Sequence, residues 1–252
     1  MNRHTRRLPV LRMTMATLAL AAAAPAAWAV EFPEAELFFE LNDLAGDLWI
    51  HTSIDGPPWT KLKITDPNKH TILNITPKGR LRTQGLTQLF IESAEPSFDE
   101  LAPEKFFRRF PPGAYVVTAP TLDGHQLQST VMLSQVMAAR PDNIVVNGVP
   151  SVTCDVPPFP TVSAPVLVDW DAVTTSHPEI GESGPVEIVR YQFFVEQTHD
   201  TTFKFSVDLP PSKTEFEIPT EILALSTDFK YEIIARTTSG NNTAVEACFT
   251  LE

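Results

Sequence analysis

The sequence is poor in cysteine, histidine and glycine, and each shortage narrows what the chain can be. It contains two cysteines, six histidines and ten glycines in 252 residues. The histidines are not spaced as zinc ligands, and no His-Glu-x-x-His motif, Gly-x-Ser-x-Gly turn or glycine-rich phosphate loop is present. The sequence therefore predicts no catalytic residue, no metal and no cofactor, and it favours a protein that is not an enzyme.

Basic side chains are also scarce. Lysine and arginine together number 19 against 31 acidic residues, which gives a net charge of −12. Because binding to phosphates needs a basic surface, this balance argues against nucleic acid as a partner. The mean hydropathy of −0.05 is too low for a polytopic membrane protein, and 43% hydrophobic residues are too many for a disordered chain.

The first 29 residues have the order of a secretory signal peptide. Positive charges come first, at Arg3, Arg6, Arg7 and Arg12. An apolar run over residues 13–24 follows, and Ala27-Trp28-Ala29 supplies the small residues that precede a cleavage site. The run is too short to span a membrane, which needs about 20 apolar residues. We therefore expect cleavage before Val30 and a periplasmic or secreted protein that does not span the membrane.

Residues 30–139 alternate apolar and polar side chains and predict a β-rich, sandwich-like domain. The expected strands cover 36–41, 48–51, 62–64, 72–75, 114–118 and 128–133. Asp55-Gly56 and Asp123-Gly124 each lie between apolar runs and predict hairpin turns, because both turn residues tolerate positive φ.

One helical insertion is expected in this domain. Ser97 and Glu100 have capping-box spacing, and the phenylalanines after them line one side of a short helical stretch interrupted by Pro103. The neighbouring acids Glu92 and Glu95 could form a carboxylate pair of the kind that glycosidases use. The capped helix start explains the same acids, since negative charge suits the positive end of a helix.

Residues 140–149 read as a linker, and residues 150–252 as a second β domain. Apolar alternation predicts strands at 166–170, 191–195, 203–207, 216–218, 229–235 and 245–249. Strands of this number and spacing fit an immunoglobulin-like sandwich. The whole chain is thus expected to be all-β, with an N-terminal β-sandwich-like domain followed by an immunoglobulin-like one.

Three pieces of this second domain resemble a fibronectin type III domain. They are Trp170 on the second strand, the segment 191–195 on the third, and the segment 223–229 leading into the sixth. Phe229 stands where that family usually has a tyrosine, so the resemblance implies a corner that is purely apolar or formed by Tyr231 in a shifted register. We favour Phe229, because Phe229, Tyr231 and the alternate residues after them then point inward together.

The two cysteines and two further groups are the candidate site residues. In an exported chain Cys154 and Cys248 can form one disulfide or remain two small buried hydrophobes. Glu40, Asn42, Asp43 and Asp47 offer oxygens to Ca²⁺, although they also suit a solvated turn. Among the aromatic residues, Trp59 follows two prolines and is the best candidate for an exposed ring that stacks on a sugar or a protein partner.

These observations leave several functions open. The first hypothesis is an exported, non-enzymatic binding, adhesion or spacer protein of the cell envelope, with an envelope protein or a polysaccharide as partner. The second is a carbohydrate-active enzyme or sugar-binding protein whose site lies in the N-terminal domain. The third is a module that pairs its edge strands with envelope proteins. Fold alone does not choose among them.

Overall fold

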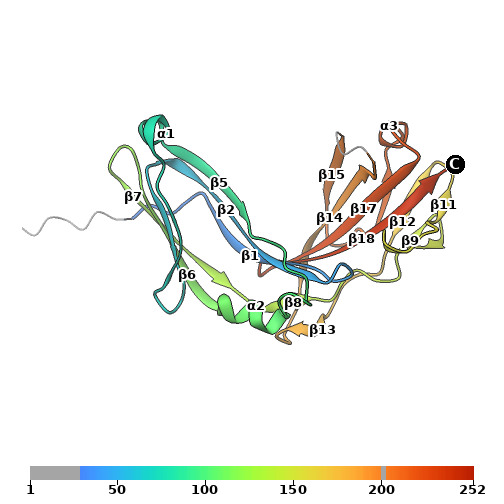
Figure 1. Cartoon of the computed structure of the whole chain (residues 1–252), viewed down its shortest axis with the longest axis horizontal. Helices are drawn as coiled ribbons and strands as arrows, with labels where there is room; N and C mark the ends of the chain where they lie inside the picture. The colour runs from blue at the N-terminus through green and yellow to red at the C-terminus, as the bar shows by residue number, and fades with distance from the viewer. Residues whose placement is uncertain (1–28, 200–202) are drawn as a thin grey trace, which may run out of the picture.

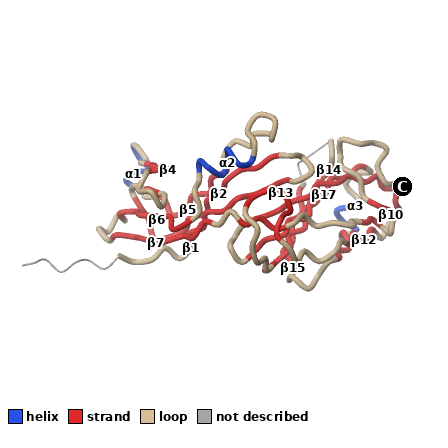
Figure 2. Tube along the Cα trace, turned by 90° about the horizontal axis from the view of Figure 1, so that it is seen from below, coloured by secondary structure: helices blue, strands red, loops and turns tan. Residues whose placement is uncertain are grey.

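The computed structural model describes residues 29–199 and 203–252. The expected signal peptide lies outside the described residues, apart from Ala29. The described chain is built mostly of strands, with three short helices (Figure 2). No helix within these two ranges is long and apolar enough to cross a membrane.

The N-terminal domain is a sandwich of two antiparallel sheets, as expected. One sheet has the order β4-β3-β6-β7. Its strands are β3 (Leu62–Thr65), β4 (Thr71–Ile75), β6 (Gly113–Pro120) and β7 (Gln126–Leu133). The other face is made by β1 (Glu34–Asn42), β2 (Asp47–Trp59) and β5 (Leu86–Glu92), with α1 (Gly79–Gln84) before β5. All six expected strands of this domain are present.

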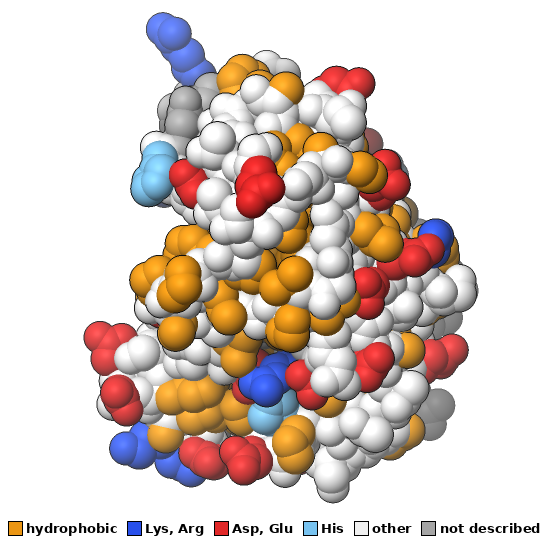
Figure 3. Space-filling view, turned by 90° about the vertical axis from the view of Figure 1, so that its right-hand side faces the viewer, with side chains coloured by type: hydrophobic (Ala, Val, Ile, Leu, Met, Phe, Trp, Pro, Cys, Tyr) orange, Lys and Arg blue, Asp and Glu red, His pale blue; other side chains and the backbone are white. Residues whose placement is uncertain are grey.

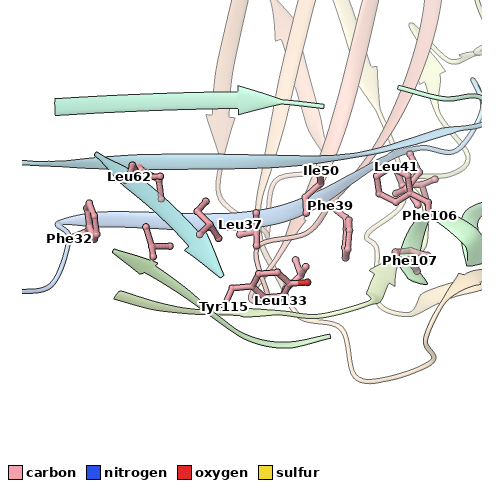
Figure 4. Packing of buried hydrophobic residues seen from close by; sticks show 14 of the residues in the cluster. Phe32, Leu37, Phe39, Leu41, Ile50, Leu62, Phe106, Phe107, Tyr115 and Leu133 are labelled. Atoms are coloured by element: carbon pink, nitrogen blue, oxygen red, sulfur yellow. The ribbon is translucent and has the colours of Figure 1, made fainter. Parts of the chain in front are cut away.

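The core of this domain follows from the alternation along β1. Leu37, Phe39 and Leu41 belong to the core between the sheets. Figure 4 shows Leu37 and Phe39 on the side of Tyr115 and Leu133 of the opposite sheet, and Leu41 beside Phe106. Helix α2 (Pro103–Arg109) closes one end with two phenylalanines packed edge-on against Phe39. Pro103 begins this helix instead of interrupting it, because the first helical position needs no N–H donor.

The C-terminal domain has the expected immunoglobulin-like arrangement. One sheet has the order β10-β9-β12-β16. Its strands are β9 (Val145–Val146), β10 (Val149–Pro150), β12 (Val166–Asp169) and β16 (Glu215–Ile218). The facing strands are β15 (Lys204–Leu209), β14 (Ile188–Gln197), β17 (Asp228–Thr237) and β18 (Asn242–Leu251). Strand β11 (Thr161–Val162) pairs with β18, and α3 (Thr220–Leu223) precedes β17.

The inward positions on β17 agree with the sequence. Phe229, Tyr231, Ile233 and Ala235 are all buried in one core, and Phe229 stacks on Phe249 with 5.2 Å between ring centroids. The corner where the family usually has a tyrosine is therefore apolar here. Trp170 belongs to the same core, which confirms its predicted place at the end of the second strand.

One sheet runs through both domains. The last three residues of β1 pair in parallel with Asn242–Ala244 of β18. This pairing joins the strands in the order β15-β14-β17-β18-β1-β2-β5. Figure 1 shows the two domains set at an angle, with this sheet forming the inner side of both arms. With β11 it is an eight-stranded sheet.

A second connection crosses the junction. The loop after β12 reaches back to the N-terminal domain, where β13 (Ser176–Gly181) pairs with β8 (Val136–Ala138). Ile180 of β13 is part of the N-terminal core, and Ala138 of β8 is part of the C-terminal core. Each domain therefore completes its neighbour's core.

Three local expectations have different outcomes. Asp123-Gly124 turns the chain between β6 and β7, with Gly124 at φ +88°. Asp55-Gly56 does not form a hairpin, because β2 continues through it to Trp59. The missing Cβ of Gly56 instead leaves room for the ring of Phe32, which would lie 3.2 Å from such an atom. Within the expected linker 140–149, Val145–Val146 form β9 and pair with β12.

Candidate functional site

Trp59 is not an exposed binding residue, contrary to the sequence prediction. Its side chain is 0% exposed and belongs to the N-terminal core. The register between β2 and β5 shifts between Asp55 and Trp59, where the ring packs inward opposite Leu86. The bulge therefore buries a side chain that the preceding prolines suggested would be in solvent, and Trp59 cannot stack on a sugar in this structure.

The four oxygen-bearing residues considered for Ca²⁺ do not converge. Glu40 accepts a hydrogen bond from Asn242, at 2.7 Å, on the inner side of the shared sheet. Asn42 accepts one from the backbone N–H of Ala45, and Asp43 faces the domain junction. Within residues 29–199 and 203–252, no group of three acidic, histidine or cysteine side chains is placed to hold a metal.

Asp43 instead holds three segments together at the domain junction. One carboxylate oxygen lies 2.9 Å from Arg140 Nη1, and the other lies 3.0 Å from His177 Nε2. Asp43 follows β1, Arg140 follows β8, and His177 lies in β13. Both Asp43 and His177 are nearly buried, so water and salt weaken this interaction less than they weaken an exposed ion pair.

The backbone sets the tautomer of His177. Its Nδ1 accepts the N–H groups of Glu179 and Ile180, at 3.1 and 2.9 Å. The ring proton of the neutral form therefore sits on Nε2 and is donated to Asp43. This hydrogen bond is the largest reason why the pKa of Asp43 lies below its ordinary value, with Arg140 adding to it.

A cavity of about 560 Å³ opens beside these three residues. Its lining comes from both the connecting segment and the loop after β12, and includes Asp142, Asp171, Thr174 and Glu179. The lining is mixed in charge and holds no phenylalanine, tyrosine or tryptophan, so it lacks the large ring surfaces on which sugars stack. We interpret this cavity as a gap left where the connecting segment and the loop after β12 meet, and not as a binding site.

The inner face of the shared sheet concentrates buried polar groups. We use "inner face" for the side that carries Phe38, Glu40, His51, Glu92, Glu232, Arg236 and Glu246. The cross-strand pairs Phe38↔His51, His51↔Glu92 and Glu232↔Glu246 place these residues on the side opposite the two cores. This face looks into the angle between the domains in Figure 1.

Two carboxyl groups of the inner face hold their protons unusually tightly. Burial raises the pKa of Glu40 to about 7, and the charges of Glu92 and Glu95 raise it further, against the hydrogen bond from Asn242. Burial raises the pKa of Glu232 to about 8, with repulsion from Glu40 and Glu246 adding to it. The two strands β1 and β17 thus bring together acids that repel one another across the domain boundary.

His51 is buried beside these acids and remains neutral. The indole N–H of Trp49 donates to its Nε2, so the ring proton lies on Nδ1, which has no hydrogen-bond partner among the described residues. Burial lowers the pKa of His51 to about 4. Because β2 extends from Asp47 to Trp59, well beyond the expected strand 48–51, the ring lies in the middle of a strand.

Cys154 and Cys248 form a disulfide, with 5.0 Å between their Cα atoms. Cys248 lies on β18, and Val152 forms a bridge with it. The bond therefore ties the segment before β11 to the strand that both domains share.

Sequence reasoning did not single out Arg140 and His177, which contact Asp43 from 97 and 134 residues away. A local pattern contains no sign of such partners. Glu40 and His51 did leave a signal, because each is a polar residue next to apolar ones: Glu40 lies between Phe39 and Leu41, and His51 follows Ile50. Such alternation predicts that these side chains lie on the face opposite the core, but it does not predict that this face is partly buried.

No protein-family model matches the chain, and no curated protein matches it. Similar solved structures include the FN1–FN3 domains of chicken CNTN1, at 12% identity and TM-score 0.34, covering 88% of this chain and 65% of that one. A segment of two fibronectin type III domains from chicken tenascin has 12% identity and TM-score 0.31, covering 86% and 97%. A bacterial ice-binding adhesin has 13% identity and TM-score 0.25, covering 89% and 66%. These TM-scores are low, so the fold described above rests on its own strand order.

Proposed function

We propose that the protein is an exported, non-enzymatic binding or spacer protein of the cell envelope, periplasmic or secreted, that holds a fixed angle between two β-sandwiches. The observation that carries this proposal is the sheet that continues from β18 into β1. The two domains share this sheet, each contributes one residue, Ala138 or Ile180, to the core of the other, and the contacts of Asp43 join them again. Domains connected in this way cannot swing freely. They present one continuous inner face, which suits a binding surface.

The size and nature of that face support binding. It crosses two domains and carries buried aromatic residues with acids around them. Figure 3, which views the C-terminal domain end-on, shows acidic side chains spread around that end with fewer basic ones. An acidic protein of this kind stays soluble and selects partners by charge. An envelope protein fits this role, and adhesion is one form that it would take.

Photo-crosslinking in the native host tests this proposal. p-Benzoyl-phenylalanine replaces Gln88 on β5, which lies on the inner face, or Gln128 on β7, which is also exposed and lies on an edge strand of the other sheet. We expect one envelope protein to be linked through position 88 and not through position 128. Equal linkage at both positions, or none at either, would contradict a binding role for the inner face.

A carbohydrate-active protein is the second candidate, and one observation favours it. Glu40 and Glu232 keep protons near neutral pH, as a general acid for glycoside hydrolysis must. Incubation of the mature chain, residues 30–252, with envelope polysaccharides tests this reading. Hydrolysis that disappears in both Glu40→Gln and Glu232→Gln would replace the non-enzymatic proposal. Activity retained in either variant would exclude this pair of carboxyls.

A further inference from the structure

On the inner face, the protein's own Arg236 shows how this surface binds a positive charge. The Arg236 guanidinium lies over the ring of Phe38, with 4.6 Å from its Cζ to the ring centroid. The same guanidinium reaches Glu36, with 2.7 Å from Nη2 to the carboxylate oxygen. Phe38 and Glu36 are two residues apart on β1 and therefore share a face. The cation thus sits between an aromatic ring and a carboxylate of one strand.

The same pair of residue types recurs on β5 without its cation. Phe90 and Glu92 are two residues apart and lie opposite Ser53 and His51 on the inner face. Phe90 is 60% exposed, and the Glu92 side chain is 47% exposed. Among the described residues, no lysine or arginine lies within salt-bridge distance of Glu92. The ring and carboxylate that a cation needs are therefore present and open to solvent.

The surroundings of Phe90 and Glu92 favour a positive ligand. Glu95 contacts Glu92, and burial followed by this contact raises the pKa of Glu95. The negative charge of Glu92 also raises the pKa of Glu40. The unpartnered Nδ1 of the buried His51 ring lies 3.9 Å from Glu92. Because this ring is neutral, it supplies no full positive charge to that carboxylate. A cation at this point would relieve repulsion among several acids at once.

The position of β5 at the end of the sheet indicates what kind of ligand can place a cation beside Phe90 and Glu92. β5 ends the path of the shared sheet, so an extended chain can approach it without crossing another strand. In an extended chain, alternate side chains point to the same side. An arginine is better suited than a lysine, because its flat guanidinium can stack on a ring and bind a carboxylate together.

We propose that an arginine of an extended, basic segment of the partner protein binds between Phe90 and Glu92, as Arg236 binds between Phe38 and Glu36. This inference rests on the proposed binding function and names the chemistry of its partner. The proposed surface spans β5 and the neighbouring acids of β1 and of the segment after β5. It requires no rearrangement of the described chain, because both side chains are already exposed.

Peptide binding to the mature protein tests the inference. The probe is a ten-residue peptide that alternates arginine with serine, and its control carries uncharged citrulline in place of arginine. We expect the arginine peptide to bind more tightly and to weaken as salt is added. Phe90→Ala and Glu92→Gln should each weaken it about two- to five-fold, and the double variant about ten-fold. Phe90→Trp should retain or strengthen binding, because tryptophan is the best cation–π partner.

Matched variants separate this site from general attraction to an acidic protein. Met132→Ala removes an equally exposed apolar side chain from β7, and Glu104→Gln removes an exposed acid from α2; neither should change the affinity. Equal binding of the arginine and citrulline peptides, or equal losses in the control variants, would overturn the site. If position 88 links an envelope protein while the arginine peptide does not bind, the binding function stands and the arginine site falls.

Discussion

The two sandwiches are similar in layers and differ in how far each is complete. The C-terminal core is made by its own strands, with Ala138 added from the neighbouring segment. The N-terminal core takes Ile180 from β13, which follows β12 in the chain, and its sheet continues into β18 of the C-terminal domain. The C-terminal domain can be recognised from a continuous stretch of sequence. The N-terminal domain is complete only with residues that come much later in the chain. A boundary that divides the sequence into two segments therefore does not separate the two packed cores, because each core includes a residue from the other segment.

The disulfide tests the self-sufficiency of the C-terminal domain, and its loss should have the largest effect. The bond joins cysteines 94 residues apart, so replacing both with alanine should lower the free energy of unfolding by about 4–5 kcal/mol in the loop-entropy model. Urea unfolding followed by the fluorescence of Trp170 measures this change. If the transition of Trp170 does not move, the sandwich does not depend on its disulfide.

Ile180→Ala tests whether the N-terminal domain depends on its neighbour's loop. The side chain is buried in the N-terminal core, and its loss should cost about 2–4 kcal/mol. Unfolding monitored in a variant that keeps only Trp49 should shift more than in one that keeps only Trp170. Val173→Ala is the matched control, because Val173 precedes β13 in the same loop and packs in the C-terminal core. Equal shifts at the two reporters would instead indicate one cooperative unit.

The acids of the inner face test how the shared sheet couples the domains. The pKa values of Glu40 and Glu232 are about 7 and about 8 in the folded state, against 4.5 ordinarily. The folded state thus binds these protons more tightly, so its stability should fall as pH rises from about 5 to about 8. Glu40→Gln and Glu232→Gln should each remove part of this fall and gain about 1–3 kcal/mol at pH 9.

The exposed Glu104 gives the control for that experiment, since Glu104→Gln should leave the pH dependence unchanged. Chemical unfolding at several pH values between 5 and 9 provides the measurement. A pH dependence that is the same in all three variants would show that repulsion across the boundary does not limit stability.

Asp43→Asn tests the angle between the sandwiches with the smallest expected effect. It removes the negative charge that pairs with Arg140 and accepts the hydrogen bond from His177, and should lower stability by about 1–2 kcal/mol near neutral pH. Because the pKa of Asp43 is lowered in the folded state, its contribution should begin to fall as pH drops below the ordinary value of 3.8 and should be lost once pH is below the lowered pKa. Small-angle X-ray scattering should show a wider range of interdomain angles; an unchanged profile would assign the angle to the sheet alone.

The sequence predicted the elements better than their connections. Alternation along 36–41 and 229–235 placed β1 and β17, because each strand's burial is recorded in its own residues. The parallel pairing of β1 with β18 leaves no local pattern, since it joins segments 202 residues apart. The prediction for Trp59 was wrong for a related reason: its burial depends on a bulge against β5, and the expected strands did not include β5.

The overlap of β1 with β18 also has a mechanical consequence. The two strands run in the same direction and meet over only three residue pairs, near the end of one and the start of the other. Tension applied at Glu34 and at Leu251 would pull them past each other along their length, like the two halves of a lap joint. The interstrand hydrogen bonds would then share the load together instead of opening one after another, so a pull through the molecule would meet its stiffest direction at the junction of its two arms.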